Sequence, residues 1–407
     1  MLGDIFELMK KHENKVWVLY NNEGMDEFFK KYFFPGIDTN TFCFVSQEKI
    51  YLIVCSLDAD NLAHIKYDSS KVEVLLYDNN DMLIEKIEDV IASLKFPNKI
   101  SLSYSTMGDI STDILTHGSY IYLKKLLKMP YTKYSKKVKF VSAEKIMYDI
   151  ASKKTKLQIE RLKVLASLTD DILRLTFKNL KLGLTEKEIV EKTQVITDEL
   201  FKNIIEEEKY NIAAYDMAWE NCPIVLTGDN LAKGGHSLPS NRKLKAGDTI
   251  YFDFGIKAIF KDGMVLYTDI QRMGYAKKKN ESKPPKSVMK VFNTLVSAIE
   301  EGIDELKPDV KGYVVDSIVR GKILHAGYPD YNHATGHPVG LKVHDIGAVI
   351  SIKQSKRANL SFTEGGVYTL EPRINIANGG SIEEMVLVTK YGGVPLCNTQ
   401  KEIYIVN

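Results

Sequence analysis

Four carboxylates and one imidazole stand out in the last two fifths of the chain, because each lies in or beside an apolar, strand-like run. Asp253 and Asp269 belong to one predicted strand pair and Glu371 and Glu383 to another, while His337 lies between the pairs in a glycine-rich loop. A buried unpaired charge is very costly, and a bound cation offsets that cost. The alternative is a set of surface acids on half-exposed strands; any one residue fits it, but the matched contexts of all five favour a metal site.

Oxygen and imidazole donors suit the harder divalent ions, Mn²⁺, Co²⁺ or Fe²⁺, with Zn²⁺ as a further candidate. Two such ions, about 3.5–4 Å apart, would share Asp269 and Glu383 as ligands. The sequence therefore predicts two divalent ions per chain, with Mn²⁺ or Co²⁺ favoured.

Whether Asp253 and Asp269 lie on the same face of their strand pair depends on the number of residues in the loop, because side chains alternate between the two faces of a strand. Asp253 and Asp269 share a face only if the loop between their strands has an odd number of residues. A three-residue loop at 261–263 meets that condition and gives Gly263 the left-handed position. It pairs Asp253 with Gln271 and leaves Asp269 diagonal to Asp253, about 7–8 Å away at the backbone. A two-residue turn would put the two aspartates on opposite faces unless a bulge intervened, so the loop length is a hypothesis.

Composition excludes several classes of protein. A chain of 407 residues is too long for one ordinary core, so two domains are expected. The formal net charge of +2 argues against a dedicated nucleic-acid or membrane binder. The four cysteines have neither metal-site spacing nor a dense disulfide pattern, and no signal peptide or membrane span is visible at this stage. We therefore expect a cytoplasmic protein.

The elements that must position the five residues fall into two predicted domains, 1–142 and 143–407. In the first, helices are predicted over 4–12, 25–33 and 82–94, and strands over 15–20, 41–46, 49–55 and 99–104. In the second, helices are predicted over 153–180, 185–208, 287–306 and 311–326, and strands near 210–216 and 224–227. No constellation that could do chemistry is found in the first domain.

Five short motifs follow one another in an order that resembles a known protein family. The motifs are Asp-Phe-Gly at 253–255, Asp-Ile-Gln-Arg at 269–272, Gly-His-Pro-Val-Gly at 336–340, Glu-Pro at 371–372 and Ile-Glu at 382–383. This ordered set resembles the pita-bread metallopeptidases, which include methionine aminopeptidase, aminopeptidase P and prolidase, and the stretch 336–345 is especially similar to prolidases. The resemblance spans residues from about 145 to 407. It implies an α/β (α+β) fold class: a creatinase-like or prolidase-like N-terminal α/β domain followed by a pita-bread catalytic domain.

The resemblance also assigns roles by position. It implies that Asp253 binds one metal ion, and that His337 and Glu371 bind the other. Asp269 and Glu383 would bridge both ions. Glu371 would in addition serve as the general base towards the attacking water.

Three further histidines match family positions. His236 matches the substrate-side histidine before the first aspartate, and His344 matches the histidine that approaches the scissile amide or the leaving group. His333 stands four residues before the ligand His337 and is predicted to line the pocket. An imidazole near neutral pH can donate to a tetrahedral intermediate or bind a carboxylate. The alternative for each is a loop histidine without a role.

The chain departs from the family at three positions near the last two carboxylates. Arg373 follows Pro372 where the family has glycine, Asn375 stands in place of a tyrosine, and Ser381 in place of an arginine. The first hairpin is also longer than usual. We hypothesise that Arg373 replaces the missing arginine and pairs with a substrate carboxylate.

The function expected from the resemblance is hydrolysis of the bond between an N-terminal residue and proline in a di- or oligopeptide, by a homodimeric Xaa-Pro dipeptidase. An aminopeptidase P acting on longer peptides is the alternative. A non-catalytic peptide-binding module of the same fold and a metal-free, creatinase-like amidinohydrolase are the other classes, and the five intact ligands disfavour both.

Overall fold

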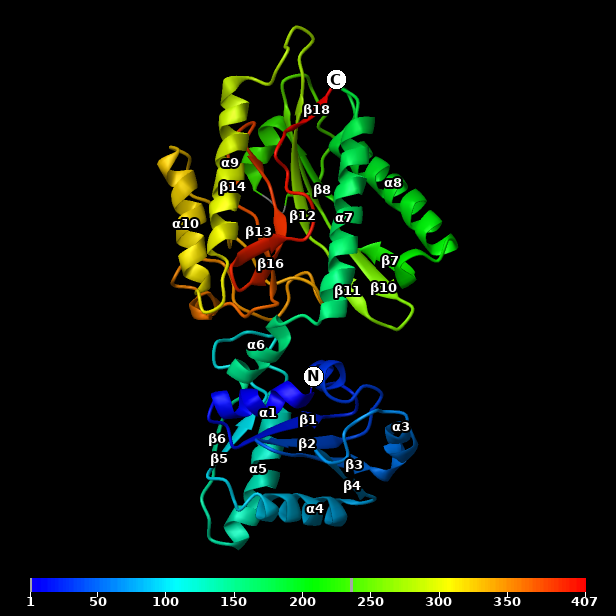
Figure 1. Ribbon diagram of the computed structural model, residues 1–407, viewed down its shortest axis with the longest axis vertical. Helices are drawn as coiled ribbons and strands as arrows, with labels where there is room; N and C mark the ends of the chain where they lie inside the picture. The colour runs from blue at the N-terminus through cyan, green and yellow to red at the C-terminus, as the bar shows by residue number, and fades with distance from the viewer. Residues whose placement is uncertain (1, 235–236) are drawn as a thin grey trace. The chain divides into compact units, whose positions relative to one another are not determined.

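The computed structural model describes residues 2–234 and 237–407, and the chain divides into two compact units, Met1–Ile150 and Ala151–Asn407 (Figure 1). Helix α6 (Glu144–Ser152) crosses this division. The boundary expected at 142/143 therefore falls just before α6, and the division by contacts falls near its end.

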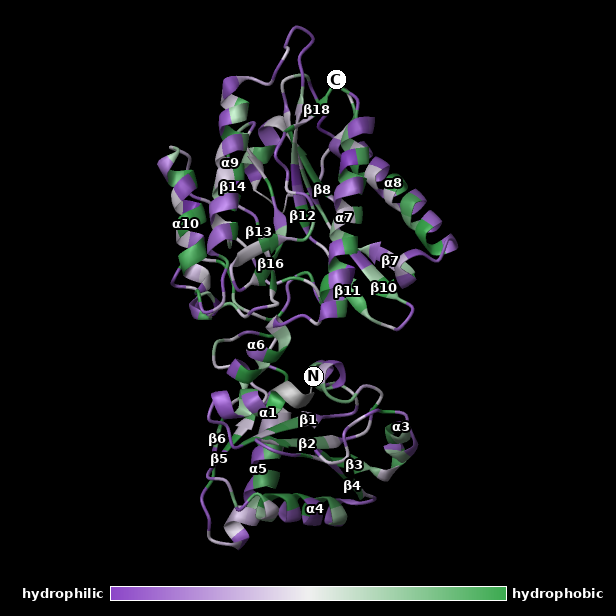
Figure 2. Ribbon diagram, in the orientation of Figure 1, coloured by the Kyte–Doolittle hydropathy of each residue, from purple (hydrophilic) through white to green (hydrophobic). Residues whose placement is uncertain are grey.

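The first unit is built on a mixed six-stranded sheet in the order β4-β3-β2-β1-β5-β6. The pairs β1–β2 and β2–β3 are antiparallel, whereas β3–β4, β1–β5 and β5–β6 are parallel. The strands are β1 (Val16–Asn21), β2 (Thr41–Ser46), β3 (Ile50–Cys55), β4 (Val72–Tyr77), β5 (Lys99–Leu102) and β6 (Lys139–Ser142). The two central strands β1 and β2 are buried along their whole length and are mostly hydrophobic in Figure 2.

Five helices accompany this sheet: α1 (Leu2–Lys11), α2 (Glu27–Tyr32), α3 (Ala59–Ala63), α4 (Asn80–Ser93) and α5 (His117–Lys133). A core of aliphatic and aromatic side chains from the strands, α4 and α5 fills one side of the sheet. The predicted strands and the predicted helix at 82–94 are present. Strand β4 and helix α5 were not predicted, because β4 is only half buried, and α5 has Pro130 inside it and apolar residues such as Ile121 and Met129 on its exposed face.

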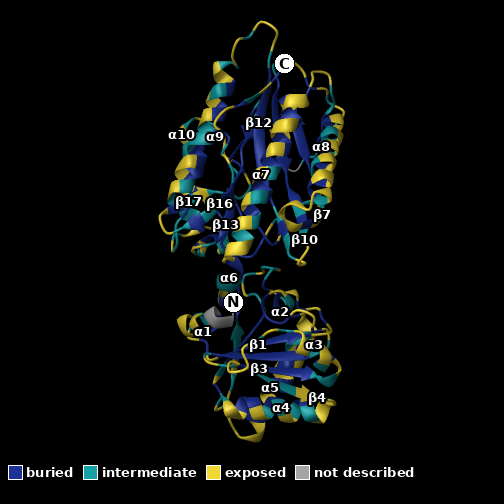
Figure 3. Ribbon diagram, turned by 45° about the vertical axis from the view of Figure 1, so that its right-hand side comes forward, coloured by how far each residue is buried: buried dark blue, intermediate teal, exposed yellow. Residues whose placement is uncertain are grey.

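The second unit begins with two long helices, α7 (Lys156–Asn179) and α8 (Glu186–Glu206). Each starts with a capping box, in which Thr155 or Thr185 and the residue three positions later satisfy each other's backbone groups. In Figure 3, helices α7 and α8 carry many exposed residues, whereas strand β12 is buried. The cap at Thr185 lies where the predicted helix over 185–208 begins.

The strands of the first hairpin region lie in two sheets. One has the order β11-β10-β7 and the other β18-β12-β9-β8. Their bounds are β7 (Ile212–Met217), β8 (Ile224–Thr227), β9 (Thr249–Phe254), β10 (Ile256–Phe260), β11 (Val265–Tyr267), β12 (Ile270–Ala276) and β18 (Tyr404–Val406). Both β9 and β12 are buried at every residue, so polar side chains on them must find partners inside the protein.

A second set of strands lies near helices α9 (Lys286–Glu305) and α10 (Gly312–His325). The strands are β13 (Val367–Leu370), β14 (Arg373–Ile374), β15 (Gly380–Ser381), β16 (Glu384–Thr389) and β17 (Gly392–Pro395), in the sheets β13-β16-β17 and β14-β15. The two helices pack on each other, and α9 covers these strands. Among the helices of the described residues, none is both long and apolar enough to cross a lipid bilayer.

Candidate metal centre

The first two carboxylates are placed by the register of β9 and β12. Asp253 faces Gln271, and the turn closes with Gly263 at a φ of 82° and a hydrogen bond from the Gly263 amide to the Phe260 carbonyl. The three-residue loop expected from parity is therefore confirmed. Asp269 lies two positions before Gln271, so Asp253 and Asp269 share one face of the hairpin, as the sequence predicted.

The other two carboxylates are placed by a hairpin whose register continues across an interruption. Leu370 pairs with Glu384 on one side and Arg373 with Ser381 on the other. Counting inward from either pair sets Glu371 across from Glu383. These two glutamates occupy the short break between the sheets β13–β16 and β14–β15.

The histidine loop runs beside β13 like an added strand. The His337 carbonyl accepts from the Thr369 amide at 2.8 Å, and the Thr335 carbonyl accepts from the Glu371 amide at 2.8 Å. Gly336 permits this approach, because a Cβ there would overlap the Thr369 carbonyl. The loop backbone thus fixes the imidazole of His337 next to Glu371.

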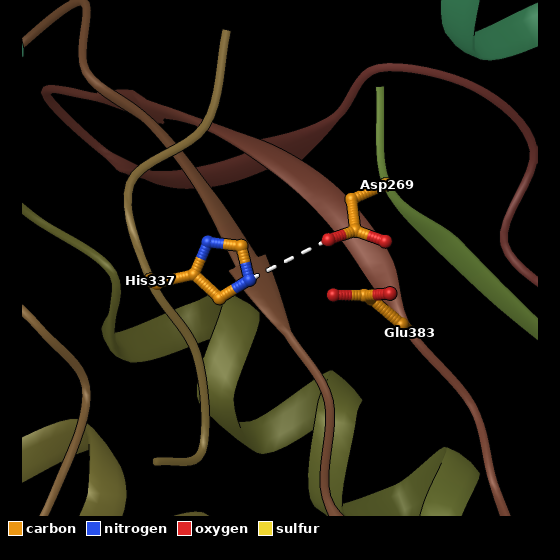
Figure 4. Close-up of side chains that lie close together, drawn as sticks. All are labelled: Asp269, His337 and Glu383. Carbon is orange, nitrogen blue, oxygen red and sulfur yellow. Dashed lines mark ion pairs between the residues drawn. The ribbon is translucent and has the colours of Figure 1, made fainter. Parts of the chain in front are cut away.

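These elements bring the predicted ligands together in one buried cluster. Donor atoms of Asp269, His337 and Glu383 all lie within 4.8 Å of one another (Figure 4). His337 Nε2 is 3.6 Å from Asp269 Oδ2 and 3.5 Å from Glu371 Oε1. Asp253 interacts electrostatically with Asp269 and Glu371. The five predicted ligands therefore lie in one cluster.

Several carboxylate oxygens of the cluster lack a hydrogen-bond donor. Among the described residues, the buried atoms without a partner include Asp253 Oδ1, Asp269 Oδ1 and both carboxylate oxygens of Glu383. Leaving buried acceptors unpaired costs free energy, and for charged groups the cost is larger. Oxygen atoms of this kind, grouped with one imidazole nitrogen, fit hard divalent cations.

The electrostatics of the cluster also favour a bound cation. Burial, followed by repulsion from the neighbouring carboxylates, raises the pKa of Asp253 and of Glu383 well above the ordinary range. Burial also raises the pKa of Glu371 to about 7, although His337 opposes that shift. For His337, burial favours the neutral ring, but contacts with Asp269 and Glu371 outweigh it and raise its pKa. Positive charge at the centre would relieve this repulsion.

Two polar residues beside the cluster were not singled out from the sequence. The Gln271 amide nitrogen lies 3.2 Å from Glu371 Oε2 and 3.5 Å from Asp253 Oδ2. The Tyr251 hydroxyl donates to Asp253 Oδ2 at 3.0 Å. Strand alternation would have found both, because Tyr251 and Asp253 are two positions apart and Gln271 was already the predicted partner of Asp253.

A buried arginine joins the two carboxylate-bearing hairpins. The Arg272 guanidinium donates to the carbonyls of Gln271 and Glu383 at 3.0 and 2.9 Å. It also pairs with Glu384 at 3.2 Å and with Asp170 of helix α7 at 2.7 Å. This network holds the backbone on which Asp269 and Glu383 are mounted.

His344 lies at the edge of the centre. Its ring packs edge-on against the ring of His337, with the centroids 4.3 Å apart, and the residue is exposed. The neighbouring Asp345 is buried and forms an ion pair with Lys154 at 3.2 Å, and it also accepts from the Leu341 amide at 2.9 Å. The side chain of His344 is therefore exposed, while the buried ion pair of Asp345 with Lys154 fixes the loop backbone next to it.

The remaining predicted site residues are placed as follows. His333 stacks at 4.8 Å on Tyr331, and its Nδ1 lies 2.7 Å from the Ala334 carbonyl. Arg373 is buried, and its pairing with a substrate carboxylate stays a prediction. His236 lies outside the described residues.

The fold and the buried carboxylate–imidazole cluster define a two-domain protein of the prolidase and creatinase type with a pita-bread second unit, so the predicted fold class is confirmed. The model of metallopeptidase family M24 matches residues 160–390 of the chain. The chain belongs to metallopeptidase family M24.

Relatives and solved structures agree with this placement. An uncharacterised peptidase of Staphylococcus saprophyticus is 30% identical over 250 residues, which cover 60% of this chain and 62% of that relative. The structure of a Xaa-Pro dipeptidase from Bacillus anthracis is similar over 100% of this chain and 99% of that one, with 19% identity and a TM-score of 0.67. An X-Pro aminopeptidase from Thermotoga maritima is similar over 96% and 97%, with 21% identity and a TM-score of 0.64.

Proposed function

We propose that this protein is a dinuclear metal-dependent exopeptidase that hydrolyses the bond between an N-terminal residue and proline. The observation that carries the proposal is the buried cluster of four carboxylates and one imidazole, in which several carboxylate oxygens have no hydrogen-bond donor among the described residues. Membership of metallopeptidase family M24 supports the reaction class.

In this proposal Asp253 would hold one divalent ion, His337 and Glu371 would hold the other, and Asp269 and Glu383 would serve as ligands to both. Mn²⁺ and Co²⁺ are the favoured ions for such a donor set. When bound, the ions polarise the peptide carbonyl and activate the attacking water.

The protein's own groups complete the chemistry. Gln271 holds one carboxylate oxygen of Glu371, so the carboxylate is oriented to accept a proton from the attacking water. His344, whose exposed ring packs against His337, is proposed to donate to the developing oxyanion or to the leaving nitrogen. His333, four residues before His337, is proposed to line the pocket with His236.

The choice of substrate follows from proline's chemistry. A peptide-bonded proline nitrogen carries no N–H, so the site need not offer it an acceptor. A Xaa-Pro dipeptidase and an X-Pro aminopeptidase both share the fold at similar TM-scores, so dipeptides and longer Xaa-Pro peptides are the two substrate classes to compare. Homodimerisation, which the resemblance implies, and the cytoplasmic location expected from the sequence belong to the same proposal.

Metal analysis and peptide hydrolysis test the proposal. Protein dialysed against Mn²⁺ should hold about two ions per chain, and Asp253→Ala should lose stoichiometric binding. Asp216→Ala, which removes an exposed carboxylate of β7, is the matched control and should bind as the wild type does. Equal metal content in wild type and Asp253→Ala would contradict the metal centre.

Hydrolysis is then measured on the metal-loaded wild type. It should release the first residue from an Xaa-Pro dipeptide and leave the matched Xaa-Ala dipeptide largely intact. Faster cleavage of Xaa-Pro tripeptides would identify an aminopeptidase P, and no cleavage of either Xaa-Pro peptide would overturn the proposed activity.

A further inference from the structure

Arg373 is buried beside the metal centre without being one of its ligands. The residue is 2% exposed, and its Nε donates to Asn375 Oδ1 at 2.6 Å while Nη2 donates to the Leu231 carbonyl at 3.3 Å. Nη1 is buried and has no hydrogen-bond partner among the described residues. An arginine keeps its positive charge under all ordinary conditions, so this cation is a fixed part of the site's surroundings.

The guanidinium reaches the cluster through one aromatic ring. Its central carbon lies 4.4 Å from the centroid of the Tyr251 ring, within the range of a cation–π contact. The Tyr251 hydroxyl in turn donates to Asp253 Oδ2 at 3.0 Å. Tyr251 and Asp253 lie two positions apart on β9 and share one face. Tyr251 therefore links Arg373 to Asp253: its ring contacts the guanidinium and its hydroxyl donates to the carboxylate.

The hairpin that carries Arg373 is itself fixed to β9. Asn378, in the turn between β14 and β15, accepts from the Thr249 amide at 2.9 Å, and the Thr249 hydroxyl donates to the Gly379 carbonyl at 3.0 Å. Thr249 begins β9, the strand that bears Tyr251 and Asp253. The position of Arg373 over the ring is thus set by backbone as well as side-chain bonds.

We propose that Arg373 is a positioning residue of the metal centre: it holds the Tyr251 ring so that the hydroxyl keeps Asp253 oriented towards its ion. The inference rests on the proposed metal centre and adds a role to it. It also differs from a direct role in binding a substrate carboxylate, because the side chain is buried and two of its three nitrogens already donate to protein oxygens.

Calorimetric titration of the metal-free protein with Mn²⁺ tests the inference without relying on activity. Arg373→Met keeps much of the side-chain length and removes the charge, and Tyr251→Phe keeps the ring and removes the hydroxyl. Each should weaken binding of the ion held by Asp253 by about 10–100-fold, the usual effect of losing a group that orients a ligand. Because both act on Asp253 in series, the double variant should bind no more weakly than the weaker single variant.

Two more variants separate positioning from general stability. Arg242→Met removes an arginine that pairs at 2.6 Å with Asp248, the residue before β9, and whose hydrogen bonds within the described part of the chain go to Thr227, Lys243 and Asp248 rather than to the cluster. It should lower the thermal midpoint but leave Mn²⁺ affinity within about twofold. Arg373→Lys keeps the charge but loses the planar fork, so its affinity should lie between those of the wild type and Arg373→Met.

The outcomes are distinguishable. If the wild type binds no Mn²⁺, the proposed function fails. If the wild type binds Mn²⁺ and Tyr251→Phe binds equally well, or if the effects of Arg373→Met and Tyr251→Phe add, the positioning role is wrong and the metal centre stands. If Arg373→Met keeps full Mn²⁺ affinity but loses the preference for an Xaa-Pro free acid over its amide, Arg373 acts on the substrate carboxylate instead.

Discussion

Gln271 and Asp253 face each other across the β9–β12 ladder, and the Gln271 amide nitrogen lies 3.5 Å from Asp253 Oδ2. The same nitrogen lies 3.2 Å from Glu371 Oε2. One neutral side chain therefore contacts two of the proposed ligands, one from each hairpin. It supplies hydrogen-bond donors without adding a charge to a group of four acids.

Gln271→Met should lower kcat while leaving metal content intact. The substitution keeps side-chain volume but removes the donor that orients Glu371, and losing such a partner usually costs about 10–100-fold in activity or affinity. Initial rates on an Xaa-Pro dipeptide and elemental analysis of the same sample measure both quantities. Wild-type kcat in this variant would show that the amide does not orient the base.

His344→Ala should also keep the metal ions but lower kcat further, by roughly 10²–10⁴-fold, the usual contribution of a proton-donating side chain. Its ring lies against His337 without replacing it as a ligand. His325→Ala, which removes an exposed histidine of helix α10, is the matched control and should have wild-type activity. Loss of metal in His344→Ala would mean that the two histidines have been assigned the wrong way round.

Lys154→Met should destabilise the second unit by about 3–5 kcal/mol, because it leaves the buried Asp345 without its ion-pair partner. Urea unfolding followed by fluorescence gives the free energy of unfolding. Adding Asp345→Asn to Lys154→Met removes the stranded charge and should recover part of the loss. A double variant no more stable than Lys154→Met would show that the cost does not come from the unpaired carboxylate.

Asp26 in the first unit should make stability depend on pH. Burial raises its pKa from 3.8 to about 7, although hydrogen bonds from the first turn of α2 oppose that shift. Between these values the folded protein binds more protons than the unfolded one, so the free energy of unfolding falls as pH rises. The contribution is complete below about pH 4 and is lost as the pH passes through about 7.

Asp26→Asn keeps an oxygen for the helix cap and removes the titrating group. Thermal midpoints measured between pH 4 and 8 should therefore fall less steeply with rising pH in the variant than in the wild type, and the variant should be relatively more stable at pH 8. Parallel curves for the two proteins would contradict the raised pKa.

The sequence predicted the parts of the centre that depend on local periodicity. The facing of Asp253 and Gln271 follows from the two-residue repeat of a strand and an odd loop, and both can be read from neighbouring residues. The position of Arg373 over Tyr251 cannot, because it depends on how the β14–β15 turn bonds to Thr249 at the start of β9. Contacts between distant segments of this kind have no periodic signal.

The buried ion pair that supports the site was not predicted from the sequence for the same reason. Arg272 belongs to a recognised motif, but its partner Asp170 lies about one hundred residues earlier, on helix α7. Helix α5 was missed for a local reason, since Pro130 and apolar residues on its exposed face hide its helical pattern.

The arrangement of the proposed ligands on two hairpins would also determine when a metal ion can bind during folding. Asp253 and Asp269 come from one hairpin, Glu371 and Glu383 from the other, and His337 from the loop beside β13, so a chain with only one hairpin formed offers an incomplete set of donors. Closing the set requires contacts between residues more than one hundred positions apart, which form slowly. Ions would then bind the finished fold far better than any partly folded chain, and their concentration would set the apparent stability of the second unit.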